Sequence, residues 1–156
     1  MKKIVLSFLV IVVGMSGCKP DEVILTPVEQ LQKDIEIIRT YLAENSIDAQ
    51  EHESGVFYVI HRQGTGIFPE ANSSVTVNYK GNILGQTELF DSNDNTSFSL
   101  LGVIVGWKIG IPLISEGGNI TLYIPSGYAY GTRGSPTGGI PANANLVFNV
   151  DLLDVI

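Results

Sequence analysis

The sequence contains a single cysteine, Cys18, and only two histidines, His52 and His61. One cysteine allows no disulfide within one chain, so the fold must be stabilised by its core alone. Neither histidine lies in a cluster of Cys, His, Asp or Glu with the spacing of metal ligands. The sequence therefore indicates no metal site and no other cofactor.

Basic residues are also few, since nine Lys and Arg stand against 16 Asp and Glu. The formal net charge of −7 argues against nucleic acid and anionic lipid as partners. The glycine-containing segments 64–66 and 131–134 lack the Gly-Lys-Ser/Thr ending of a phosphate-binding loop. Ser126 lacks the Gly-x-Ser-x-Gly context of a hydrolase nucleophile, so neither chemistry is indicated.

No apolar run is long enough to cross a bilayer. Residues 4–17 number 14, whereas a spanning helix needs about 18–20. This run follows Lys2 and Lys3 and ends in Met15-Ser-Gly-Cys18, which is typical of a lipoprotein signal. A short membrane-anchor helix is the alternative. We expect residues 1–17 to be a cleaved signal peptide.

Cleavage would make Cys18 the lipidated N-terminus, and lipid chains on it would anchor the protein to a membrane. We therefore expect a location in the bacterial cell envelope, at the outer membrane, facing either the periplasm or the outside. Loss of two of the nine basic residues and no acidic one would leave a net charge of −9.

A helical pattern follows a polar tether at residues 18–27. Four apolar residues recur at spacings of four, three and four, which predicts an amphipathic helix over residues 28–45: Leu31, Ile35, Ile38 and Leu42. Thr26 and Pro27 suit its N-cap and first position. Its apolar face could pack on the main domain, form a homodimer, or belong to a spacer, and the sequence does not decide. Residues 46–54 are expected to be a linker.

The period changes from helical to period two at Gly55. Runs rich in β-branched and aromatic residues, bounded by Gly, Pro, Asn or Ser, predict strands at Val56–Ile60, Val75–Tyr79, Asn119–Ile124 and Asn145–Leu153. One short helical segment is expected at about Gly106–Leu113. The pattern predicts a single α+β domain over residues 55–156, large enough for one core.

The most informative run of residues lies near the C-terminus. Tyr128 and Tyr130 precede a Gly-rich loop, an Ile140-Pro141 corner and a final strand that carries Phe148. This run predicts a cleft with aromatic walls, a hydroxyl at its rim and almost no charge. Such a site suits an uncharged apolar ligand, and a proline in a peptide fits it.

Six motifs in one order, of which the last two belong to this run, extend the pattern over the domain. They are Val77–Gly81, Leu89–Ser92, Phe98, Val103–Trp107, Tyr128–Gly131, and Ile140-Pro141 followed by Leu146–Val150. In order and spacing the segment from Gly55 to Ile156 resembles the FKBP-type peptidyl-prolyl isomerases, the macrolide-binding immunophilins. The resemblance implies a half-wrapped antiparallel β-sheet curled around one short helix, with an apolar cleft between them.

The resemblance also implies the site residues. It gives six with catalytic roles: Tyr79, Phe90, Asp91, Trp107, Tyr130 and Phe148. It gives four that contact substrate: Phe98, Val103, Ile104 and Ile140. Ligand carbonyls would accept hydrogen bonds from the Tyr130 hydroxyl and the Ile104 N–H. The partners implied are proline-containing polypeptides and macrolide immunosuppressants.

Each residue also has a structural alternative. The aromatic residues could be ordinary core residues, and Asp91 could cap a turn, bond the Tyr79 hydroxyl or orient a ligand. Thr96 stands where the family often has a second aromatic residue, and Ser135 where some members carry an aromatic or His. Two functions stay open, an isomerase that assists folding of exported proteins and a non-catalytic prolyl-peptide-binding chaperone or adaptor.

Overall fold

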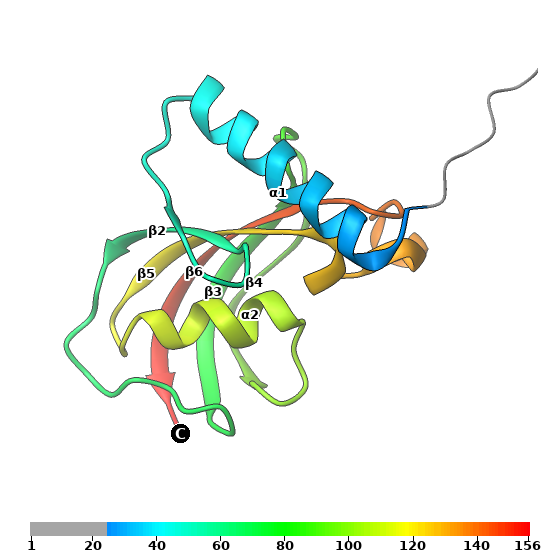
Figure 1. Ribbon diagram of the computed structural model, residues 1–156. Coiled ribbons are helices and arrows are strands. Elements are labelled where there is room, and N and C mark those ends of the chain that lie inside the picture. The colour runs from blue at the N-terminus through cyan, green and yellow to red at the C-terminus, as the bar shows by residue number, and fades with distance from the viewer. Residues whose placement is uncertain (1–24) are drawn as a thin grey trace, which may run out of the picture.

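The computed structural model describes residues 25–156 (Figure 1). The predicted signal peptide, the lipidation site Cys18 and most of the tether lie outside these residues. Within residues 25–156, no helix has both the length and the apolar character that a membrane span requires.

The first element is the helix α1, Pro27–Glu44. Its N-terminus has the predicted cap: the Thr26 hydroxyl accepts a hydrogen bond from the Glu29 N–H, and the Glu29 carboxylate accepts one from the Thr26 N–H. This reciprocal pair satisfies two donors that a helix start would leave unpaired. Thr26 as N-cap and Pro27 as first helical residue are therefore confirmed.

The remaining chain forms a six-stranded antiparallel sheet in the order β1-β2-β5-β6-β3-β4. The strands are β1 Gln50–Glu51, β2 Phe57–Arg62, β3 Ser74–Ile83, β4 Leu89–Ser99, β5 Asn119–Ile124 and β6 Leu146–Val155. The four expected strands are present as β2, β3, β5 and β6. Two were not expected: β1 lies in the segment assigned to a linker, and β4 follows β3.

The short helix α2, Val105–Gly110, continues as the 3₁₀ turn η1, Ile111–Leu113, which matches the helical segment expected there. Three more 3₁₀ turns connect β5 to β6: η2 Ser126–Tyr128, η3 Gly131–Arg133 and η4 Pro136–Gly138. The predicted fold class, an α+β domain whose antiparallel sheet curls around one short helix after an N-terminal helix, is confirmed.

The two helices cover opposite faces of the sheet (Figure 1). Alternate residues of a strand point to opposite faces. Along β5, Ile120, Leu122 and Ile124 join the core on the α2 side, whereas Tyr123 joins a smaller cluster on the α1 side. Apolar residues of β5 are therefore buried on both faces, in the main core on the α2 side and in the smaller cluster on the α1 side.

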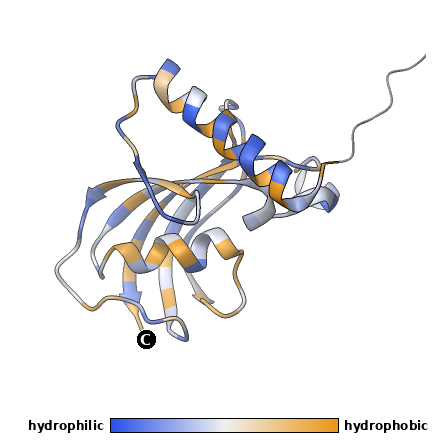
Figure 2. Ribbon diagram, in the orientation of Figure 1, coloured by the Kyte–Doolittle hydropathy of each residue, from blue (hydrophilic) through white to orange (hydrophobic). Residues whose placement is uncertain are grey.

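The apolar stripe of α1 packs against the sheet in the smaller cluster. Ile38 and Leu42 are buried against Phe57 and Tyr123 of the sheet. Figure 2 shows α1 with apolar and polar residues mixed along its length, as expected of a helix with one buried stripe. Of the three alternatives for this helix, the structure has packing on the main domain. A homodimer through residues 28–45 stays a prediction.

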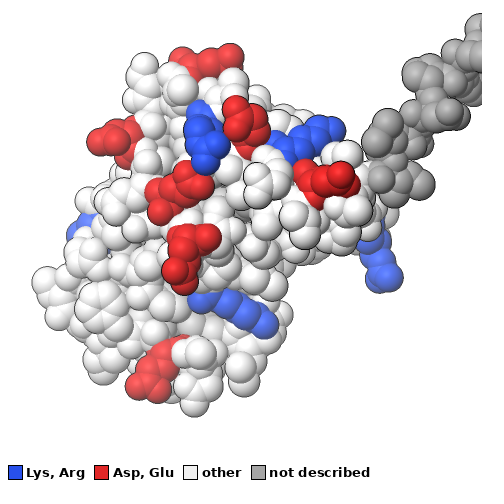
Figure 3. Space-filling model, in the orientation of Figure 1, with Lys and Arg blue, Asp and Glu red and all other residues white. Residues whose placement is uncertain are grey.

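Charged side chains on the surface are interspersed. On the face shown in Figure 3, basic residues lie singly among acidic ones. Arg39 of α1, for example, contacts Glu36 at 3.2 Å and Glu51 at 3.0 Å. This face therefore carries no basic patch of the kind that attracts nucleic acid.

Candidate functional site

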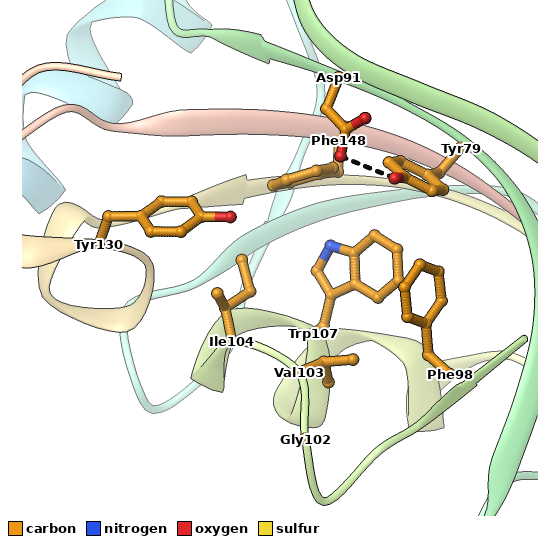
Figure 4. A pocket seen from close by; sticks show the side chains of 9 residues that line it. All are labelled: Tyr79, Asp91, Phe98, Gly102, Val103, Ile104, Trp107, Tyr130 and Phe148. Atoms are coloured by element: carbon orange, nitrogen blue, oxygen red, sulfur yellow. Dashed lines mark hydrogen bonds between the residues drawn. The ribbon is translucent and has the colours of Figure 1, made fainter. Parts of the chain in front are cut away.

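A cavity of about 300 Å³ opens between the sheet and α2 (Figure 4). We call it the aromatic pocket. Five of its residues are aromatic and only one carries a charge. Its lining consists of Tyr79, Asp91, Phe98, Gly102, Val103, Ile104, Trp107, Tyr130 and Phe148.

The floor of the aromatic pocket is Trp107, whose side chain is buried. It lies on α2, which approaches β5 closely because two helix positions lack side chains. A Cβ at Gly106 would lie 2.4 Å from Ile124, and one at Gly110 would lie 2.4 Å from Leu122. These two glycines therefore set the depth of the pocket.

Three aromatic rings pack edge-on against the indole. Their centroids lie 5.3 Å (Tyr79), 5.5 Å (Phe98) and 5.4 Å (Phe148) from that of Trp107, with interplanar angles of 83° to 87°. Edge-to-face pairs of this kind are favoured by the ring quadrupoles. Packing between these aromatic rings therefore fixes the walls of the pocket.

The Tyr79 hydroxyl donates a hydrogen bond of 2.7 Å to Asp91 (Figure 4). It also accepts a weaker one, 3.4 Å long, from the Asn93 amide. Burial, and to a lesser extent the bond to the Asp91 carboxylate, raises the pKa of Tyr79 above its ordinary value. Of the roles left open for Asp91, the bond to Tyr79 is present, and orienting a ligand stays a prediction.

An irregularity in β4 lies beside Asp91. Gly81 pairs with Asp91 and Asn82 with Leu89, which leaves Phe90 as an extra residue between them. Such a bulge alters the direction of the side chains beside it. Gly81 makes room there, since a Cβ would lie 2.6 Å from Phe148 and 2.8 Å from Phe90.

Two predicted site residues lie outside the lining. Phe90 is half-buried behind Phe148, with ring centroids 5.6 Å apart, and it lines a different surface hollow. Ile140 is buried in the core and forms an isolated β-bridge with Ser135. Phe90 therefore packs against the pocket wall from outside, and Ile140 belongs to the same core cluster as Trp107 and Phe148. Direct substrate contact by either one stays a prediction.

One lining residue, Gly102, was not named from the sequence. It has no side chain, and the signal that could have found it is its place just before Val103 and Ile104. The other eight lining residues were all expected from the motif order.

Three donors at the pocket have no hydrogen-bond partner among residues 25–156. They are the buried indole N–H of Trp107, the hydroxyl of Tyr130 and the backbone N–H of Ile104. Figure 4 shows the Tyr130 ring at the mouth with its hydroxyl directed over the pocket. The Ile104 carbonyl, by contrast, has a partner, because it accepts a hydrogen bond of 3.0 Å from the backbone N–H of Trp107.

The apolar lining and the unpaired donors determine what the aromatic pocket can bind. It can enclose a small apolar group and donate hydrogen bonds to carbonyl oxygens around that group. Within the described part of the chain, no three His, Cys, Asp or Glu residues gather as a metal site would require.

Comparison with known proteins gives a consistent result. The family model for the FKBP-type peptidyl-prolyl cis-trans isomerases matches residues 66–153. Among curated proteins, FKBP-type peptidyl-prolyl cis-trans isomerase FkpA of Escherichia coli K12 is 44% identical over 105 residues, which are 65% of this chain and 38% of that protein. The FkpA of Aeromonas hydrophila is 39% identical over 120 residues, 74% of this chain and 44% of that protein.

Solved structures agree on the fold. A peptidyl-prolyl cis-trans isomerase from Pseudomonas syringae superimposes with a TM-score of 0.69 at 30% identity, covering 80% of this chain and 94% of that one. The structure of Escherichia coli FkpA superimposes with a TM-score of 0.68 at 37% identity, covering 81% of this chain and 62% of that one. The chain spans about two fifths of the length of the curated relatives it matches.

Proposed function

This chain belongs to the family of FKBP-type peptidyl-prolyl cis-trans isomerases, and from that premise we propose that it catalyses rotation about X–Pro bonds. The observation that carries the proposal is the aromatic pocket, with its Trp107 floor and its unpaired donors at Tyr130 and Ile104.

The reaction makes modest demands on a protein. Resonance sets a barrier of about 18–20 kcal/mol to rotation about the amide. The planar amide is polar, whereas the twisted amide has lost resonance and much of that polarity. A dry aromatic pocket therefore disfavours the planar ground state relative to the twisted state. A thousandfold acceleration requires only about 4 kcal/mol of such a difference.

The pocket residues suit this task. Trp107, Phe98 and Phe148 would enclose the proline ring. Donation from Tyr130 or the Ile104 N–H to a substrate carbonyl would hold the peptide while the bond turns. Tyr79 bonded to Asp91 would fix the wall. No proton leaves any group, so no nucleophile or general base is needed.

The substrates we propose are proline-containing segments of exported proteins. This part rests on the sequence, because the lipoprotein pattern that ends at Cys18 predicts anchoring in the bacterial envelope. Mass spectrometry of the protein purified from a bacterial host would test it. A diacylglyceryl adduct on Cys18, absent in Cys18→Ala, is expected, and an unmodified Cys18 behind an intact leader would contradict it.

A protease-coupled proline assay on residues 19–156 tests the activity. We expect rates well above the uncatalysed one, and Trp107→Leu should lower kcat/KM by about tenfold or more, a loss of roughly 1.4 kcal/mol of transition-state stabilisation. Phe68→Leu is the matched control, because Phe68 is exposed and outside the pocket. Wild-type rates equal to the uncatalysed rate would overturn the enzyme proposal.

Thr96 supports a second candidate, a module that binds prolyl segments without turnover. It takes a position where the family often has an aromatic ring, so the pocket has one wall fewer. Titrating Trp107 fluorescence with a proline peptide separates the two functions, since the second candidate requires saturable binding without catalysis.

A further inference from the structure

A second hollow, of about 550 Å³, lies beside the aromatic pocket. We call it the α1 groove, because the first half of α1 forms one wall and the turns η2 and η3 form the other. In Figure 1 these turns, coloured orange, lie directly beside the first turns of α1. The groove is lined by Leu25, Pro27, Gln30, Leu31, Lys33, Ser126, Gly127, Gly131, Thr132 and Asn143.

We propose that the α1 groove binds the residues that flank the proline of an extended polypeptide substrate. The proposal rests on the proposed function, because it gives the aromatic pocket a second subsite. It makes α1, which precedes the family domain, part of the substrate-binding surface.

The α1 groove adjoins the aromatic pocket. Tyr130 lines the aromatic pocket, and the next residue, Gly131, lines the groove. Consecutive Cα atoms are about 3.8 Å apart, and an extended chain advances about 3.3–3.6 Å per residue. A peptide whose proline occupies the pocket therefore needs only a few more residues to enter the groove.

The lining of the α1 groove combines unpaired polar groups with apolar surface. The backbone N–H of Gly127, the hydroxyl of Thr132 and the side-chain amide of Asn143 have no hydrogen-bond partner among residues 25–156. Leu25 and Leu31 add apolar surface next to them. An extended peptide offers unpaired backbone groups and alternating side chains, and this mixture of free polar groups and apolar patches matches it.

The charge of the lining indicates which kind of peptide the α1 groove would bind. Lys33 is the only charged residue in the lining. The groove therefore selects neither strongly acidic nor strongly basic segments, which fits uncharged stretches of an unfolded protein.

The two walls of the α1 groove are fixed to each other. Asp34 of α1 is fully buried and accepts hydrogen bonds from both the N–H and the hydroxyl of Ser126. Hydrogen bonds thus join the two walls of the groove. A site formed before the ligand arrives avoids the cost of ordering it on binding.

Gly127→Leu tests the proposal by filling the groove. Gly127 is exposed, has no heavy atom within 4 Å of an ideal Cβ, and has no left-handed backbone that would strain another residue. Ala43→Leu is the matched control, because it adds a leucine side chain at an exposed position in the last turn of α1.

Two proline peptides with the same central sequence are compared, one of about four residues and one of about twelve with uncharged extensions on both sides, so that only the second can reach the groove. We expect the unmodified protein to show a kcat/KM about fivefold higher for the long peptide, the gain of roughly one net hydrogen bond. Gly127→Leu should abolish this preference and leave the short peptide within about twofold, whereas Ala43→Leu should keep it.

Equal rates for the two peptides in the unmodified protein would overturn the proposal, and this is also the result if residues before Leu25 fill the groove. An equal loss for both peptides in Gly127→Leu would overturn it too. If neither peptide is isomerised, the proposed function fails by itself. The groove is then judged by isothermal titration, where tighter binding of the long peptide that Gly127→Leu abolishes would uphold it.

Discussion

Asp34 and Ser126 lie 92 positions apart in the sequence and are bound to each other inside the protein. The Asp34 carboxylate accepts from the Ser126 N–H at 2.9 Å and also from its hydroxyl. Its other oxygen accepts from the Gln30 amide at 2.7 Å. Because a buried carboxylate is costly unless its oxygens are bonded, this arrangement fixes α1 against the loop that leads to Tyr130.

Replacing Asp34 with Ala should destabilise the domain. The Ser126 hydroxyl would lose its only partner within the described residues, and we expect the free energy of unfolding to fall by about 1–3 kcal/mol. Urea denaturation followed by Trp107 fluorescence measures the change. Asp48→Ala is the control, since Asp48 is exposed. Equal midpoints for the two variants would show that the buried bonds contribute nothing.

Ile38→Ala should lower stability by about 2–5 kcal/mol, because the side chain is fully buried between α1 and the sheet. The neighbouring Ile37 is 44% exposed, so Ile37→Ala should change little. Because Ile38 packs on its own domain, the unfolding midpoint should not vary with protein concentration. A midpoint that rises with concentration would instead indicate a dimer through residues 28–45.

Gly106→Ala should impair both stability and the proposed activity. The added methyl would meet Ile124 at 2.4 Å, so α2 must move away from β5 and carry Trp107 with it. Overpacking of this kind costs about 1–3 kcal/mol. Gly102→Ala is the control for stability, because its Cβ would approach only Ser99, at 3.6 Å. Thermal unfolding that leaves the two variants alike would contradict the close packing of α2.

The aromatic residues of the pocket could be predicted because their signal is independent of the fold. Trp107, Tyr130 and Phe148 each stand in a short motif, and the order of those motifs carries the resemblance to the family. The predicted strands were found for a related reason, since β5 and β6 alternate apolar and polar residues along a half-buried sheet.

The strand β4 could not be found in this way. It lies at the edge of the sheet, and most of its residues between Phe90 and Phe98 are polar and exposed, so no alternation marks it. Its bulge at Phe90 likewise depends on the pairing with Gly81. Pattern rules also place carboxylates on the outer face of a helix, and the burial of Asp34 depends on Ser126, which no local pattern reveals.

Stability should fall at alkaline pH. Burial raises the pKa of both Tyr79 and Tyr123 in the folded protein. Each therefore keeps its proton in the folded state where the unfolded chain releases it, above about pH 10. The contribution is present below that pH and is lost as the pH rises toward the folded pKa. Urea midpoints measured across this range should fall less steeply in Tyr79→Phe, and identical slopes would contradict the assignment.

Tyr130→Phe should lower kcat/KM for a proline peptide without loss of stability. The Tyr130 side chain is 39% exposed, and its hydroxyl has no partner among residues 25–156, so the folded protein loses no bond when the oxygen is removed. If the hydroxyl grips the substrate carbonyl in the twisted state, its loss should cost about 0.5–1.5 kcal/mol, or roughly two- to tenfold in rate. Tyr128→Phe is the control from the same Tyr-Ala-Tyr motif, because Tyr128 lies outside the pocket lining. A kcat/KM for Tyr130→Phe equal to that of Tyr128→Phe would leave the Ile104 N–H as the donor that holds the substrate.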